Sequence, residues 1–121
     1  MKIIGIDWGE SKIGLARAGG LLAEPLVVVK PADLEKMLVV EKPELLVIGI
    51  SENQSAQKAR DFGIKLGEKL GIKVKFVDET LSTAEAQIRS REAGIGQQKR
   101  HGMEDAYAAT ILLQNYLDSL S

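Results

Sequence analysis

Lys2-Ile3-Ile4-Gly5-Ile6-Asp7 opens the chain with a short apolar run that ends on a carboxylate, a pattern typical of a buried strand. Two further extended stretches follow, over residues 12–17 and 21–29. Gly19-Gly20 between them indicates a tight turn, which joins the two stretches into a hairpin. Pro25 cannot donate a backbone hydrogen bond, so we expect the third strand at a sheet edge or with a bulge there.

Helices and strands alternate over the rest of the chain. The spacing of apolar residues predicts a helix over 32–42, a strand over 45–50, a helix over 55–70, a strand over 73–77, a helix that begins at Ser82, a loop over 93–101 and a helix over 103–119. Pro43 and Gly71 end the first two helices. The residues at core spacing in the last helix are Ala106, Ala109, Leu113, Tyr116 and Leu120.

This order predicts an α/β fold with one mixed five-stranded sheet. Strand–helix–strand crossovers are right-handed, which places the fourth strand beside the first and the fifth beside the fourth. The expected strand order is therefore 3-2-1-4-5, with helices on both faces, and this topology matches the RNase H-like fold. The 121 residues form a single domain, 1–121, because one core can be buried at this length.

Composition narrows the functional classes. The chain is 45% hydrophobic and 27% charged, as in ordinary soluble proteins. It has no cysteine, which excludes a disulfide scaffold and a thiolate metal site. The first apolar run is too short for a signal peptide, and no run approaches the roughly 20 residues that span a bilayer, so we expect a cytoplasmic protein with no membrane partner. The net charge of −1 argues mildly against nucleic-acid binding.

Three carboxylates are expected to meet at one sheet edge. Asp7 ends the first strand, Glu79 follows the fifth, and Asp105 opens the last helix. Ligand sites in open α/β sheets lie at the carboxyl ends of the strands. Carboxylate oxygens suit Mg²⁺ or Mn²⁺, and two such ions can hold the attacking and leaving oxygens of a phosphodiester. Asp78 competes with Glu79, because neighbouring strand residues face opposite ways and spacing alone does not choose between them.

Three stretches, in chain order, form a recognisable pattern: Gly5-Ile6-Asp7-Trp8-Gly9 followed by Lys12-Ile13-Gly14-Leu15-Ala16, then Asp78-Glu79-Thr80-Leu81-Ser82-Thr83-Ala84-Glu85-Ala86, then Asp105-Ala106-Tyr107-Ala108-Ala109-Thr110-Ile111-Leu112-Leu113-Gln114-Asn115-Tyr116-Leu117. Together they resemble the YqgF family, also called RuvX, of RNase H-like proteins. The resemblance covers nearly the whole chain. By motif position it gives the catalytic and metal-binding roles to Asp7, Glu79 and Asp105, and so favours Glu79 over Asp78.

The resemblance implies a metal-dependent nuclease, a hydrolase of phosphodiester bonds that uses Mg²⁺ or Mn²⁺ as two ions. Its implied substrate is structured nucleic acid: the 5′ end of the 16S ribosomal RNA precursor or, alternatively, a Holliday junction in branched DNA. Two features depart from the family pattern and bear on substrate choice. Thr80 stands where the family usually has Arg, and the loop over 51–55 is short and lacks the usual Pro.

Basic residues supply candidate phosphate contacts, because phosphate backbones are held mainly by positive charge. The nucleic-acid-binding candidates are Lys12, Arg89, Arg91, Lys99 and Arg100. A solvated surface explains the charges before the last helix equally well. For Arg17 a solvated hairpin face is favoured over a phosphate contact, and for Trp8 packing is favoured over base stacking.

Other functions stay open at this level. A non-catalytic nucleic-acid-binding module could keep the same fold. A nucleotide-binding domain is disfavoured, because actin-like ATPases close two such domains around their nucleotide and no Walker-type loop is present. A resolvase cuts two equivalent strands and needs a dimer, whereas RNA trimming does not, so the sequence leaves monomer and homodimer open.

Overall fold

The structure is a computed structural model, and it describes residues 1–50, 56–78 and 102–120. Its elements are β1 (Ile3–Asp7), β2 (Ile13–Ala18), β3 (Glu24–Val29), η1 (Pro31–Asp33), α1 (Leu34–Glu41), β4 (Leu45–Ile50), α2 (Ala56–Leu70), β5 (Lys73–Asp78) and α4 (Glu104–Ser119). The helix predicted from Ser82 and the loop predicted over 93–101 lie outside the described residues. None of the described helices is long and apolar enough to cross a membrane.

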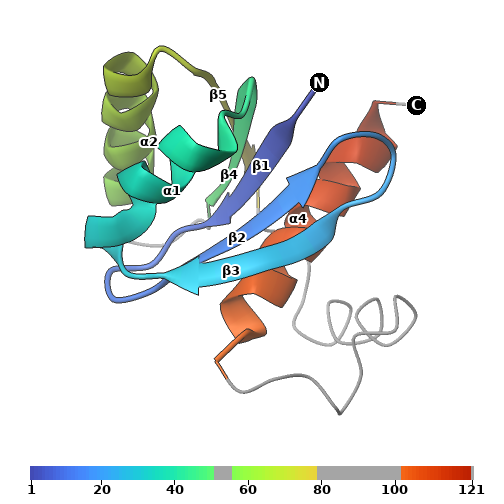
Figure 1. Cartoon of the computed structure of the whole chain (residues 1–121), viewed down its shortest axis with the longest axis horizontal. Helices are drawn as coiled ribbons and strands as arrows, with labels where there is room; N and C mark the ends of the chain where they lie inside the picture. Colours follow the sequence, from blue (N-terminus) through green and yellow to red (C-terminus); the bar gives the residue numbers. More distant parts are fainter. Residues whose placement is uncertain (51–55, 79–101, 121) are drawn as a thin grey trace.

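The described strands form one sheet in the order β3-β2-β1-β4-β5, which confirms the predicted order (Figure 1). β1 is antiparallel to β2 and parallel to β4, and β4 is parallel to β5. β3 is an edge strand, and its register with β2 shifts between Leu15, opposite Val27, and Ala16, opposite Pro25. Pro25 therefore lies both at an edge and at an irregularity, where its missing N–H costs least.

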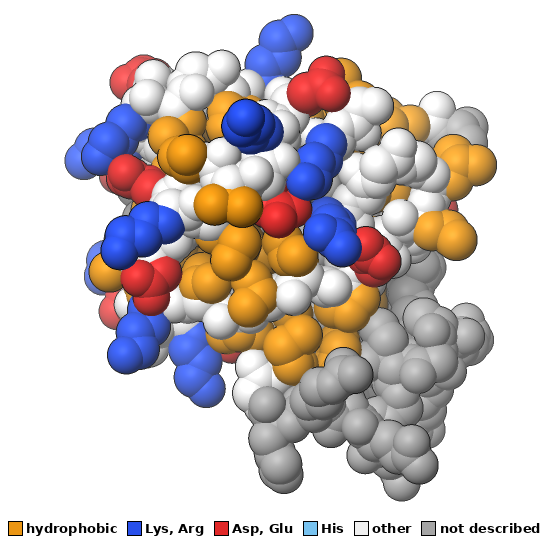
Figure 2. Space-filling model, in the orientation of Figure 1, with side chains coloured by type: hydrophobic (Ala, Val, Ile, Leu, Met, Phe, Trp, Pro, Cys, Tyr) orange, Lys and Arg blue, Asp and Glu red, His pale blue; other side chains and the backbone are white. Residues whose placement is uncertain are grey.

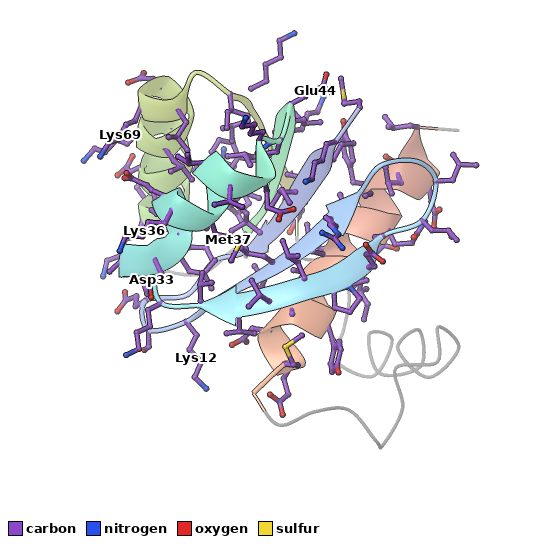
Figure 3. The ribbon with its side chains drawn as sticks, in the orientation of Figure 1. Lys12, Asp33, Lys36, Met37, Glu44 and Lys69 are labelled. Carbon is purple, nitrogen blue, oxygen red and sulfur yellow. The ribbon has the colours of Figure 1, made fainter. Side chains whose placement is uncertain are left out.

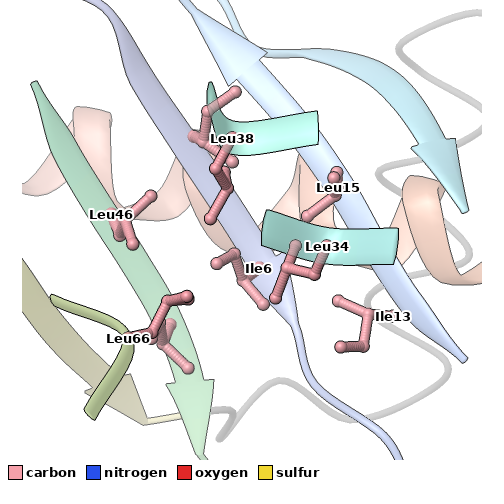
Figure 4. Close-up of a cluster of buried hydrophobic side chains, with 9 residues drawn as sticks. Ile6, Ile13, Leu15, Leu34, Leu38, Leu46 and Leu66 are labelled. Atoms are coloured by element: carbon pink, nitrogen blue, oxygen red, sulfur yellow. The ribbon is translucent and has the colours of Figure 1, made fainter. Parts of the chain in front are cut away.

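Helices cover both faces of the sheet, as predicted. α1 and α2 lie on one face over a cluster of buried side chains, part of which Figure 4 labels: Ile4, Ile6, Ile13, Leu15, Leu34, Leu38, Leu46, Ile48 and Leu66. α4 lies on the other face, against β1, β2 and β3, with a second cluster: Ile3, Ala16, Ala18, Val47, Ala109, Leu112 and Leu113. Because alternate strand residues point to opposite faces, these clusters assign each strand position to one layer.

The β2–β3 hairpin differs from its prediction. β3 begins at Glu24 rather than at residue 21, and Leu21 and Leu22 are 85% and 79% exposed. Gln114 of α4 holds this connection instead: its Oε1 accepts from the Ala23 N–H at 2.8 Å, and its Nε2 donates to the Leu21 carbonyl at 3.0 Å. A side chain distant in sequence thus takes the place of ladder hydrogen bonds, which the local apolar pattern cannot reveal.

The core face of α4 is also shorter than predicted. Ala106, Ala109 and Leu113 are fully buried, and Tyr116 packs against the same cluster. Leu120 continues the spacing but is 65% exposed, so its assignment to the core was wrong. It follows the last helical residue, Ser119, as the C-cap, where apolar spacing no longer implies burial.

Candidate active site

Asp7 is the last residue of β1 and points to the face that α4 covers. Alternation along β1 places Ile3, Gly5 and Asp7 on that face, and Ile3 belongs to the α4 cluster. In register, Asp7 lies between Gly14 of β2 and Gly49 of β4. Both neighbours are glycines, so no side chain flanks the half-buried Asp7 carboxylate at these two positions of the sheet.

The first turn of α4 brings Asp105 to the same place. Asp105 is the second residue of the helix and is half-buried. A Cβ atom on Gly14 would overlap the carbonyl group of Asp105 and would lie 2.7 Å from the backbone nitrogen of Ala106. The backbone of α4 therefore rests on Gly14, the cross-strand partner of Asp7. Since such partners lie about 4.5–5.5 Å apart, Asp7 and the turn that carries Asp105 are direct neighbours.

A second glycine sets the direction of α4. A Cβ atom on Gly5 of β1 would lie 2.8 Å from the Leu113 Cβ and 3.2 Å from the Ala109 oxygen. Asp105, Ala109 and Leu113 recur every four residues, so they form one ridge along the helix. Gly5 and Gly14, on adjacent strands, let this ridge approach the sheet closely. The ridge begins with Asp105, which lies at the sheet end where β1 stops.

Asp105 also has a local structural role. Acidic residues in the first turn stabilise a helix by about 0.3–1 kcal/mol through the macrodipole, and both Glu104 and Asp105 are in that turn. The N-cap residue, Met103, makes no side-chain capping hydrogen bond. Glu104 is exposed, whereas Asp105 is half-buried over Gly14. The macrodipole accounts for an acid in the turn but not for the position of Asp105 beside Asp7.

Asp78 lies on the other face of the sheet from Asp7. Val74 and Phe76 of β5 pack against the α1–α2 cluster, and alternation gives Asp78 the same face. Val77, between them, packs against the α4 cluster. Asp78 is also exposed. This geometry argues against Asp78 as a partner of Asp7; its competitor Glu79 lies outside the described residues.

Two carboxylates from separate elements fit a divalent cation with oxygen ligands. Mg²⁺ typically takes one or two protein carboxylates and keeps several waters. Over residues 1–50, 56–78 and 102–120, no group of three His, Cys, Asp or Glu side chains is placed to hold an ion. Asp7 and Asp105 therefore form part of the predicted ligand set, whose third member falls beyond the described ranges.

The β1–β2 connection presents Lys12 and buries part of Trp8. Lys12 is exposed, and Figure 3 shows its side chain extending past the end of the sheet. Trp8 packs instead against the α1–α2 cluster, with its ring 5.8 Å from that of Phe62. The packing interpretation of Trp8 is thus confirmed. Glu10 ties the same connection to α2 through an ion pair with Lys58, 3.0 Å between Oε1 and Nζ.

Arg17 takes part in an ion-pair network away from the candidate site. Its Nε donates to Glu24 Oε1 at 2.7 Å, and its Nη1 lies 3.5 Å from Glu41 Oε1. The hydrogen bond with Glu24 raises the pKa of the Arg17 guanidinium. Arg17 pairs in register with Ile4, whose side chain belongs to the α1–α2 cluster. Arg17 is therefore on the opposite face of the sheet from Asp7. This agrees with the prediction that favoured a hairpin face over a phosphate contact for Arg17.

Glu41→Gln should destabilise the fold by about 1 kcal/mol at neutral pH. Glu41 Oε1 lies 2.8 Å from Lys2 Nζ, and this ion pair lowers the pKa of the Glu41 carboxyl below its ordinary value of 4.5. A lowered pKa gives stability that is present above pH 4.5 and is lost as pH falls through the folded-state pKa. Denaturant unfolding should therefore show the gap between wild type and variant closing in acid. A gap that does not change with pH contradicts this account.

The remaining predicted phosphate contacts, Arg89, Arg91, Lys99 and Arg100, lie outside the described residues. Conversely, sequence reasoning gave no packing role to Gly14 and Gly49, which flank Asp7, or to Gly5, although Gly5 and Gly14 stand in the first motif. The available signal was a glycine inside each strand, since this often marks a close approach of another backbone.

Comparison with known proteins places this chain in a family. The RuvX family, described as Holliday junction resolvase, matches residues 1–119. A relative from Anaeromyxobacter sp. (strain Fw109-5), named "Putative pre-16S rRNA nuclease", is 38% identical, with 98% of this chain and 97% of the relative covered. A relative of the same name from Burkholderia ambifaria (strain MC40-6) is 34% identical, with 98% and 90% covered. These alignments span 133 and 134 positions, more than the 121 residues here, so both relatives contain insertions relative to this chain.

Solved structures show the same fold. Thermus thermophilus RuvC matches with a TM-score of 0.67 at 18% identity, covering 99% of this chain and 96% of that chain. The fowlpox virus Holliday junction resolvase matches with a TM-score of 0.67 at 15% identity, covering 100% of each chain. These similarities confirm the RNase H-like fold. By the match over residues 1–119 and by its curated relatives, the chain belongs to the RuvX family.

Proposed function

We propose that this chain is a metal-dependent nuclease that hydrolyses phosphodiester bonds of structured nucleic acid. The observation that carries the proposal is the approach of the α4 backbone to Gly14, which sets Asp105 beside Asp7. Family membership supports the same activity, because the family is described as a Holliday junction resolvase and its curated relatives carry a nuclease name.

Asp7, Glu79 and Asp105 would hold Mg²⁺ or Mn²⁺, as two ions. When bound, these ions supply an activated water and neutralise charge on the phosphate. The chain itself fixes the carboxylates: Asp7 by the ladder of β1, and Asp105 by a helix held on the sheet at Gly5 and Gly14. The proposal requires no nucleophilic side chain.

The proposed substrate is the 5′ end of the 16S ribosomal RNA precursor, in the cytoplasm. The names of the curated relatives support this choice. A Holliday junction is the second candidate, which the description of the family favours. The relatives contain insertions that this chain lacks. We propose that this difference, the loop over 51–55 and Thr80 together bear on substrate choice.

Cleavage assays test both candidates. The chain is incubated with an RNA that carries the precursor 5′ leader and with a four-way DNA junction, each in Mg²⁺, in Mn²⁺ and in EDTA. Cleavage that requires metal supports the nuclease, and the preferred substrate chooses between the two candidates. The molecular mass of the protein in solution helps to choose between the two substrates. Paired cuts in a Holliday junction require a homodimer, whereas a monomer can trim RNA. Binding without cleavage in either metal overturns the nuclease and leaves a non-catalytic module.

Glu79→Gln should abolish cleavage, whereas Asp78→Asn should retain it within a few-fold. The two substitutions remove the same charge from adjacent positions, so they act as controls for each other. Asp78 is exposed and on the opposite face from Asp7, which is why its carboxylate is expected to be dispensable. The measurement is the initial cleavage rate at saturating Mg²⁺. The reverse pattern, with Asp78 required and Glu79 dispensable, shows that the second metal ligand is misassigned.

A further inference from the structure

Two lysines stand just beyond the last registered pair of the β2–β3 ladder. That pair is Ile13 with Val29, so the next cross-strand positions are Lys12 and Lys30. Lys30 keeps an extended backbone, with φ −77° and ψ 152°, before the 3-10 turn begins at Pro31. Both lysines are exposed. This end of the hairpin therefore carries two exposed lysines, one on each strand.

The lysine pair lies on the same face of the sheet as the candidate site. Ile13 belongs to the α1–α2 cluster, and Val29 packs against it. By alternation, Lys12, which precedes Ile13, and Lys30, which follows Val29, take the face of the sheet that α4 covers. On that face, the neighbouring row of the sheet is Asp7–Gly14–Val28. A two-residue step along a strand is about 6.5–7 Å. Lys12 and Lys30 thus stand one step outside the row that carries Asp7.

The charge of this pair is available to a ligand. Neither lysine makes an ion pair with any other residue that the structure describes, whereas Lys2, Arg17, Lys58 and Lys69 each pair with a carboxylate. On the face that carries α1 and α2, Figure 2 shows basic and acidic side chains interspersed. The candidate site itself gathers acidic residues, which repel a polyanion. Cations at its rim would offset that repulsion where a phosphate backbone enters.

We propose that Lys12 and Lys30 together hold the phosphate backbone of the substrate strand where it crosses the end of the β2–β3 hairpin. This inference rests on the proposed function. It adds Lys30 as a phosphate contact, and it places the path of the substrate strand across the end of the β2–β3 hairpin. Lysine acts as a point charge with rotatable donors, so the pair binds phosphates without reading base sequence. The contact is therefore expected on RNA and DNA alike.

The test compares two double variants that lose the same charge. Lys12→Gln with Lys30→Gln removes the proposed contact. Lys36→Gln with Lys65→Gln is the matched control, since both lysines are exposed, lie on α1 and α2, and form no ion pair within the described part of the chain. Affinity for a labelled single-stranded RNA and for a four-way DNA junction is measured in EDTA over a range of KCl concentrations. EDTA prevents metal-dependent cleavage and removes divalent competitors for phosphate.

Each lost phosphate contact should reduce the slope of log Kd against log salt by about 0.7 on single strands and about 0.9 on duplex DNA. We expect the Lys12/Lys30 variant to lose about twice these amounts and the control to keep the wild-type slope. The single variants should each lose about one contact, which keeps the test decisive if the double variant folds poorly. A wild-type slope in the Lys12/Lys30 variant, or an equal loss in both double variants, overturns the proposal.

The readout separates this inference from the nuclease proposal, because it uses neither metal nor cleavage. A chain that shows the expected slopes but cuts neither substrate keeps the lysine contact and loses the nuclease. A chain that cuts with metal, yet shows wild-type slopes in the Lys12/Lys30 variant, keeps the nuclease and loses the lysine contact.

Discussion

Asp7→Asn is expected to reduce metal-dependent cleavage by about a thousandfold or more, which corresponds to roughly 4 kcal/mol of transition-state stabilisation. Asn preserves the shape of the side chain but removes the charge that a hard cation requires. Asp7 lies at the end of β1 between two glycines, so no neighbouring side chain in its row can replace it. The measurement is the single-turnover cleavage rate in saturating Mg²⁺, for wild type and variant, on whichever substrate wild type prefers.

Two controls keep this result interpretable. Asp33→Asn removes the same charge from an exposed position at the start of α1, where the side chain makes no capping hydrogen bond, and it should cleave within about twofold of wild type. Thermal unfolding with and without Mn²⁺ reports metal binding directly, because a ligand that binds only the folded state raises its stability. Wild type should gain stability from Mn²⁺ and Asp7→Asn should not. Unimpaired cleavage by Asp7→Asn would rule out the metal mechanism.

Gly14→Ala is expected to reduce cleavage by about a hundredfold or more, although it removes no functional group. The added Cβ would overlap the carbonyl group of Asp105 and lie 2.7 Å from the Ala106 nitrogen. Both obstacles are backbone atoms, which cannot rotate away as a side chain can. The start of α4 must therefore move off the sheet and take Asp105 with it. The strain should also lower the free energy of unfolding by about 1–3 kcal/mol.

Gly19→Ala is the matched control for this substitution. It adds the same methyl group in the same hairpin, but apart from its chain neighbours no heavy atom of the described residues lies within 4 Å of the new Cβ. Cleavage and stability should remain close to wild type. Rates are compared at a temperature where denaturation curves show that both variants are fully folded. If folded Gly14→Ala cleaves within a few-fold of wild type, then the contact between α4 and β2 does not position Asp105.

Sequence reasoning predicted Asp7 and Asp105 as site residues, and the structure brings them together at Gly14. The sequence could predict where both residues lie, because a strand end and a helix start are local features with clear sequence signals. It could not choose between Asp78 and Glu79 from spacing, since that choice depends on which face of β5 packs against which helix. The packing of Val74, Phe76 and Val77 supplies that information for Asp78. The predicted role of Glu79 stays a prediction.

The sequence by itself determined the order of strands and helices, the 3-2-1-4-5 sheet and the elements that carry Asp7 and Asp105, because periodicity, turn residues and crossover handedness are local or nearly local constraints. Only the tertiary structure decided how deeply α4 lies on the sheet, that Gln114 rather than a longer ladder holds the β2–β3 connection, and that Leu120 is exposed. Each of these depends on two surfaces that are distant in sequence and meet only when the chain folds. The fit of Asp105 over Gly14 belongs to this second group, and it sets the distance between the two acids.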